Sequence, residues 1–189
     1  MKNWWLYIKF LINSSNQHGV HSPFVYALVV KCFYNNKNLE IYKKLEPKHK
    51  DFNKAKFLYR FVHYFKFDSV YYPENISSNF KSALSLAHGS KGIISYAKNF
   101  QNIDDFDKNQ FIYLNNKSLE NSSNIKNIIK QCSNNSIIII ENIRQTPNIF
   151  KQWKELKSST FVRVSIDTFD WGILCFRKEQ HKEHFVIRI

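Results

Sequence analysis

Two histidines near the N-terminus, His18 and His21, are the first residues whose type and spacing could carry chemistry. They flank Gly19 in the segment NQHGVHSPF. A metal site would need at least a third ligand, and no cluster of His, Cys, Asp or Glu at ligand spacing lies nearby in the sequence. One imidazole could instead act as a general base in a segment that closes a crevice. The structural alternative is that Gly19 permits a tight turn and Ser22 caps a helix beginning at Pro23.

The cysteines and a second histidine pair do not indicate a metal site either. Cys32, Cys132 and Cys175 are odd in number, far apart and set among apolar residues, which favours neither a disulfide framework nor zinc. His181 and His184 belong to the charged segment KEQHKEH, whose composition favours a solvated linker between two strands. We therefore expect no metal, a reducing compartment and a cytoplasmic location.

The N-terminal run WWLYIKFLI is apolar, but it is too short to span a bilayer and is interrupted by Lys9. Its apolar residues share one helical face, made of Trp4, Trp5, Ile8, Leu11 and Ile12. We expect this face to dock on the rest of the domain. An interfacial membrane contact and a groove on a partner are the alternatives.

The net charge of +13 indicates either an anionic partner or a compositional bias toward lysine. Arginine, the residue best suited to bidentate phosphate or guanine contacts, occurs only five times, which argues against sequence-specific DNA binding. Between Lys31 and Lys66, ten basic residues accompany three acidic ones in a zone rich in Phe and Tyr. This basic aromatic zone predicts contact with an unidentified protein partner or weak RNA binding, the latter through Lys43, Lys44, Lys48 and Lys50.

The elements that must position these residues follow from the apolar spacing. A chain of 189 residues with 43% hydrophobic residues can form one well-cored domain. Helical spacing follows the Ser22–Pro23 pair and recurs in DFNKAKFLYRFVHYF from Asp51. We expect residues 1–66 to form a helical N-terminal extension packed on a core of residues 67–189, as a single structural unit.

From Phe67 onward, short apolar runs alternate with helix-length segments, which is typical of an α/β fold with a parallel sheet covered on both faces. We expect about seven strands. Five are predicted to be parallel, in DSVYY, GIISY, QFIYL, SIIIIE and FVRVSID, with the run from Ser136 to Ile140 at the centre. The runs GILCF and HFVIRI are separated by a short charged segment, and we expect them to form an antiparallel terminal hairpin at one edge.

Two segments of the chain resemble a known family. NQHGVHSPF near the N-terminus and the C-terminal stretch that contains RKEQHKEHF are similar to bacterial class I S-adenosylmethionine-dependent methyltransferase-like proteins. The resemblance implies a Rossmann-like methyltransferase fold whose seven-stranded sheet ends in an antiparallel hairpin. It also implies a cofactor crevice beside the first two strands.

The cofactor motifs of that family are degenerate in this sequence. The turn after the first strand should be rich in glycine, because the backbone must approach the methionine moiety closely. Here Pro73 and Ser77 stand at the glycine positions. The second strand should end in a carboxylate for the ribose hydroxyls, but it offers Ser95, Tyr96 and Lys98. The crevice that remains would be vestigial, and its residues are Tyr72, Pro73, Glu74, Asn75, Ser77, Ser95, Asn115 and Asn142.

The sequence thus predicts a degenerate methyltransferase-like protein that has lost ordinary S-adenosylmethionine binding and acts as a binding or scaffold protein, with no cofactor. The alternatives are an active S-adenosylmethionine-dependent O-methyltransferase with a remodelled pocket, and non-specific RNA binding through the basic aromatic zone. For an active enzyme, the catalytic candidates are His18, His21 and Glu141, because Glu141 alone keeps the sign of charge expected after the SIIII strand.

Overall fold

The computed structural model describes residues 4–35, 37, 39–89, 93–96, 108–119 and 122–189. Its longer helices and short helical turns are α1 (Trp4–Asn13), η1 (Gln17–Gly19), α2 (Pro23–Leu28), η2 (Val29–Phe33), η3 (Glu40–Lys44), α3 (Phe52–Phe65), α4 (Ser78–His88), α5 (Asn116–Leu119), α6 (Ser122–Gln131) and α7 (Pro147–Ser158). Its strands are β1 (Ser69–Tyr72), β2 (Ile93–Tyr96), β3 (Gln110–Leu114), β4 (Ile137–Glu141), β5 (Val164–Asp167), β6 (Trp171–Cys175) and β7 (Glu183–Val186).

The described strands form one sheet in the order β2-β1-β3-β4-β6-β5-β7. β1, β2, β3 and β4 are mutually parallel. β5 runs in the same direction as β4, because both are antiparallel to β6. The predicted set of five parallel strands in one sheet is therefore confirmed, and the run of isoleucines in β4 lies at the middle of the sheet.

The predicted terminal hairpin is wrong. β6 does not pair with β7; it is inserted between β4 and β5, antiparallel to both, and β7 pairs parallel with β5 at the edge. Burial explains the arrangement, since every residue of β6 is buried whereas Glu183 and His184 of β7 are exposed. An entirely apolar strand gains more from a central position, and a partly charged one suits an edge.

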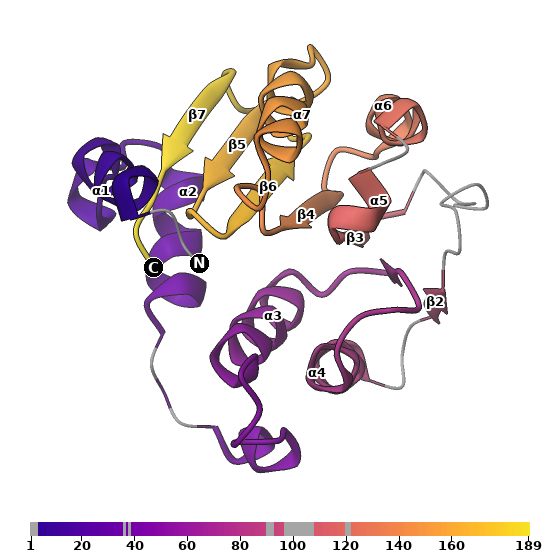
Figure 1. The fold of residues 1–189 in the computed structure, drawn as a ribbon. Coiled ribbons are helices and arrows are strands. Elements are labelled where there is room, and N and C mark those ends of the chain that lie inside the picture. Colours follow the sequence, from indigo (N-terminus) through magenta and orange to yellow (C-terminus); the bar gives the residue numbers. More distant parts are fainter. Residues whose placement is uncertain (1–3, 36, 38, 90–92, 97–107, 120–121) are drawn as a thin grey trace.

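Helices cover both faces of the sheet, as Figure 1 shows for α3 and α4 on one side and α5, α6 and α7 on the other. On the first face, alternate strand residues such as Val70, Phe111 and Ile139 pack with α2, α3 and α4. On the second face, Ile112 and Ile138 pack with the helices that follow β3 and β4. The alternation of side chains along each strand thus supplies two cores.

Hydroxyl side chains begin the helices that carry these faces. The Ser22 hydroxyl accepts a hydrogen bond from the backbone N–H of Val25 at 3.5 Å, with Pro23 in the first helical position, so the capping interpretation of NQHGVHSPF is confirmed. Thr146 caps α7 in the same way, through the N–H of Ile149 at 3.2 Å.

The N-terminal segment lies along the edge strand. The N–H of Ser15 donates to the carbonyl of Val186 at 2.8 Å, and Ser15 forms a parallel bridge with Ile187. α1 beside it is oriented differently from the expectation. The predicted docking face is largely open, with Trp4 70%, Trp5 79% and Ile12 78% exposed, while Phe10 is buried.

Candidate functional site

The carboxyl ends of the parallel strands form the edge at which ligands bind in open α/β sheets, in the crevice where the strand order reverses. Here the chain leaves β1 for β2 on one side and reaches β3 on the other, so the reversal lies between β1 and β3. The Asn115 side-chain N–H donates to the Asn75 Oδ1 at 3.0 Å across this point. The predicted crevice residues Asn75 and Asn115 thus lie together and bond to each other.

Four of the other predicted crevice residues lie at the end of β1 or in the turn that follows it: Tyr72, Pro73, Glu74 and Ser77. Tyr72 is only 5% exposed and Pro73 is buried, whereas Glu74 is exposed. Ser77 caps α4, since its hydroxyl accepts from the N–H of Phe80 at 3.3 Å. The backbone of Ser95 pairs with β1, while the side chains of Ser95 and Tyr96 lie outside the described residues.

Glu141, the end residue of β4, is engaged by a buried phenol. The Tyr113 hydroxyl donates to Glu141 Oε2 at 2.5 Å. Burial, reinforced by the negative charge of Glu141, raises the pKa of Tyr113 well above its ordinary value, so the phenol stays protonated and remains a donor. The neighbouring Asn142 has a φ of 51°, a left-handed conformation that asparagine tolerates better than most residues.

Lys54 of α3 reaches over the end of β4 and joins the groups there. Its ammonium lies 3.3 Å from the Oδ1 of Asn142, 3.7 Å from the Oδ2 of Asp170 and 3.9 Å from the Oε1 of Glu141. One cation thus faces two carboxylates and an amide, all partly exposed. Sequence analysis missed Lys54, because it lies 88 residues before Asn142, nearly half of the chain away, and nothing in its spacing marks it.

Two cavities adjoin this cluster, and Lys54, Phe169 and Asp170 line both. The first, of about 480 Å³, lies between α1, α3 and the β5–β6 hairpin. The second, of about 630 Å³, lies between the hairpin and the start of α7. Both volumes fall within the range of small-molecule sites.

The first cavity combines aromatic walls with an excess of positive charge. Its cations are Lys54, Lys56, Arg60 and Arg188, against the carboxylate of Asp170. Its aromatic residues are Tyr7, Phe10, Phe33, Phe57, Phe169 and Trp171. Part of the basic aromatic zone therefore lines a cavity rather than a flat surface.

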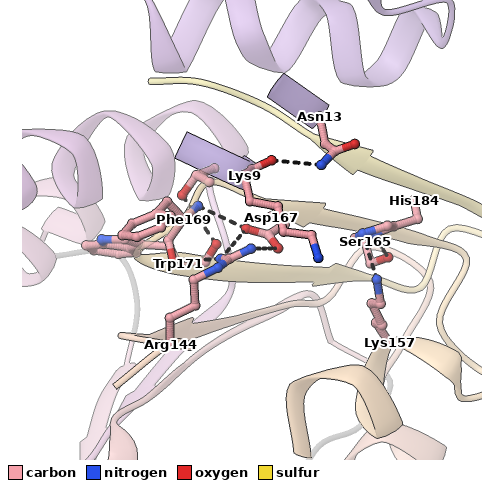
Figure 2. A network of polar contacts seen from close by, with 10 residues as sticks. Lys9, Asn13, Arg144, Lys157, Ser165, Asp167, Phe169, Trp171 and His184 are labelled. Atoms are coloured by element: carbon pink, nitrogen blue, oxygen red, sulfur yellow. Dashed lines mark hydrogen bonds and ion pairs between the residues drawn. The ribbon is translucent and has the colours of Figure 1, made fainter. Parts of the chain in front are cut away.

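The wall between the two cavities is the β5–β6 turn, which a buried ion pair fixes (Figure 2). The Arg144 guanidinium donates to both carboxylate oxygens of Asp167, at 2.7 and 2.6 Å, and to the carbonyl of Phe169 at 2.9 Å. Asp167 in turn accepts from the N–H of Phe169 at 2.9 Å. These bonds hold Phe169 at a φ of 74°, which is unfavourable for a bulky side chain.

The histidines stand apart from the cavities. His18 and His21 are exposed and line neither of them, so the structure does not place an imidazole beside Glu141. His184 bonds the Ser165 hydroxyl at 2.9 Å and the Lys157 ammonium at 2.7 Å, as Figure 2 shows. Burial and the charge of Lys157 lower the pKa of His184. Within the described ranges, no group of His, Cys, Asp or Glu could hold a metal ion.

The cysteines are also unsuited to chemistry. Burial raises the pKa of Cys32, Cys132 and Cys175 to about 12, so their thiols stay protonated at neutral pH. All three are free. They behave as apolar packing residues.

The four lysines proposed for polyanion contact are all exposed, in η3 and in the turn before α3. Lys43 is paired with Glu40 at 2.6 Å, an exposed pair that adds little stability. These lysines do not line either cavity. The surface they form is therefore separate from the Lys54 cluster.

No protein-family model matches the chain, and no curated protein matches it. In the part of the chain that the structure describes, no helix is both long and apolar enough to cross a membrane.

Proposed function

We propose that the chain is a degenerate class I methyltransferase-like protein that has lost ordinary S-adenosylmethionine binding and acts as a binding protein. The two end segments that resemble the family support this, as does a largely parallel sheet with one antiparallel strand near its end. The observation that carries the proposal is that Asn115 bonds Asn75 between β1 and β3, whereas the two cavities lie beside Asn142, after β4, and Trp171, the first residue of β6.

The residues at the crevice fit the cofactor poorly. Pro73 is buried at a glycine position, and the Asn115 side chain donates to the Asn75 Oδ1 at the point where the cofactor would lie. Leaving hydroxyls of a bound ribose unpaired costs roughly 1 to 3 kcal/mol, or about one to two decades of affinity. The loss of close backbone approach at Pro73 and the unpaired ribose hydroxyls affect different ends of the ligand, so the two penalties to binding add at least in part.

The basic aromatic cavity between α1, α3 and the hairpin is the proposed binding site. Its cations favour an anionic group, and its aromatic rings favour a flat apolar body. Lys54 lines this cavity and contacts Glu141 and Asn142, so a ligand bound there would lie next to the end of β4. The ligand class is thus a small anion with an aromatic portion.

Titration calorimetry with S-adenosylmethionine and S-adenosylhomocysteine tests the loss of the cofactor site. We expect no binding at sub-millimolar ligand, whereas a micromolar dissociation constant for either compound would overturn the proposal. Binding combined with methyl transfer would favour the active methyltransferase, whose best support is Glu141 hydrogen-bonded by Tyr113 at the end of β4.

The cavity is tested separately with an aromatic sulfonate, 1-anilinonaphthalene-8-sulfonate, whose fluorescence rises in apolar sites. We expect saturable binding that Lys54→Gln together with Lys56→Gln weakens. Lys130→Gln, which removes an exposed cation on α6, is the matched control and should leave the affinity unchanged. Equal affinity in all variants would exclude this cavity as the binding site.

A further inference from the structure

The outward face of α1 exposes large apolar side chains. Trp4, Trp5 and Ile12 are each at least 70% exposed. With Ile8, the residues Trp4, Trp5 and Ile12 follow helical spacing, so they project from the same side. Single exposed apolar residues are common, but a cluster that includes two tryptophans marks an interaction surface.

The opposite face of α1 is firmly held, which fixes the direction of the outward face. The rings of Tyr7 and Phe10 meet that of Phe169 edge-on, at centroid distances of 4.9 and 5.3 Å. The Arg144 guanidinium lies 5.4 Å from the centre of the Phe10 ring. The helix end is closed by the Asn13 side chain, which donates to the carbonyl of Lys9 at 2.7 Å. Because α1 is docked through this opposite face, Trp4 and Trp5 remain exposed to solvent.

Charge decides between the possible occupants of this face. A second copy of the chain would bring together two molecules of net charge +13, which repel each other. An anionic surface is attracted instead, and Lys9 on α1 is exposed. Arg188 is exposed as well, and it lines the same cavity as Tyr7 and Leu11 of α1.

The residue types match the boundary of a lipid bilayer. Tryptophan prefers the headgroup region, where its ring is apolar and its N–H remains hydrated. The ten described residues of α1 extend about 15 Å, roughly half the thickness of the hydrocarbon core, so the helix would lie on the surface. We propose that the outward face of α1 docks the protein on an anionic bilayer surface.

Tryptophan fluorescence provides a direct test, because Trp153 and Trp171 are buried and only Trp4 and Trp5 can change environment. The full chain is mixed with vesicles of phosphatidylcholine containing about one third phosphatidylglycerol. We expect a blue shift of the emission and quenching by brominated lipid. Vesicles of phosphatidylcholine alone should give much weaker binding, and raising the salt from about 0.05 to about 0.5 M should release the protein.

Vesicle sedimentation of variants shows which residues make the membrane contact. Trp5→Ser combined with Ile12→Ser should lower the partition coefficient by about tenfold or more, because the lost apolar area no longer inserts. Phe161→Ser, at an exposed apolar residue before β5, is the matched control and should bind as the unmodified chain does. Near-ultraviolet circular dichroism checks that each variant is folded.

Three outcomes would overturn the membrane proposal: no binding to anionic vesicles at low salt, binding that the double variant leaves unchanged, or self-association that the double variant abolishes. The last would make the face an interface between copies. The membrane proposal does not depend on the aromatic cavity. The sulfonate assay tests Lys54 and Lys56, whereas the vesicle assay tests Trp5 and Ile12.

Discussion

Gly172 in β6 lies against the ring of Trp153 from α7, and replacing this glycine with alanine should destabilise the fold. A Cβ built on Gly172 would lie 2.6, 2.7 and 2.9 Å from three carbons of the indole. Ordinary contacts between carbons are about 3.5–4.0 Å, so the ring would have to move by about 1 Å. Trp153 is fully buried, which leaves it little room to move.

Overpacking of this kind costs about 1 to 3 kcal/mol, and we expect Gly172→Ala to lower the free energy of unfolding by about 2 kcal/mol. For a chain of this size that corresponds to a fall of roughly 4 to 8 °C in the melting temperature. Urea denaturation followed by circular dichroism measures the change. Gly19→Ala is the control, because its Cβ would meet only the Ser15 side chain, at 3.0 Å, and should cost less.

A double-mutant cycle separates the clash from other effects of alanine. Trp153→Leu removes the ring, so Gly172→Ala should cost clearly less in that background. If Gly172→Ala changed the unfolding free energy by less than about 0.5 kcal/mol, the close packing of α7 on β6 would be refuted. An equal cost with and without the ring would attribute the loss to the backbone of β6.

Three further outcomes are expected. Asp167→Asn leaves the buried Arg144 cation without its partner and should cost about 3 kcal/mol in urea denaturation, whereas Glu155→Gln, in the exposed pair with Lys126, should change stability by less than about 0.5 kcal/mol. The pKa of His184 is lowered in the folded state, so the unfolded chain takes up a proton first as the pH falls through about 6.5. The free energy of unfolding should therefore decline from pH 7 to pH 5, and His184→Gln should reduce that decline. Heparin affinity should be weak, fall steeply with salt and disappear when glutamate replaces the exposed lysines of the polyanion surface, whereas salt-independent binding would point to compositional bias. Those lysines are Lys43, Lys44, Lys48 and Lys50.

The strands could be predicted from the sequence because their signal is local. Four consecutive isoleucines in β4 suit only a position buried on both faces, and that strand is indeed central. The pairing of β6 could not be predicted, since the short segment before β7 favours a hairpin and the preference of WGILC for the interior is a property of the whole sheet.

Within the candidate site, the residues at the ends of the strands could be predicted. Asn75, Asn115, Glu141 and Asn142 follow apolar runs, so their place at one edge can be read from the sequence. Lys54 could not be predicted, because its position depends on how α3 crosses the sheet. The orientation of α1 was missed for a related reason: the helix is apolar on both sides, so periodicity could not decide which side is buried.

The insertion of β6 between β4 and β5 has a consequence for folding during synthesis. When Asp167 has left the ribosome, β5 has no neighbour in the sheet, because β6 occupies the place beside β4. The outer edge of β4 stays open until residue 175 is available, and β5 and β7 can join only after that. The chain must therefore keep a row of unpaired isoleucine backbone groups exposed for the time needed to add about 35 residues, a few seconds at ordinary rates of synthesis. This window is when pairing with another chain would compete with the native fold.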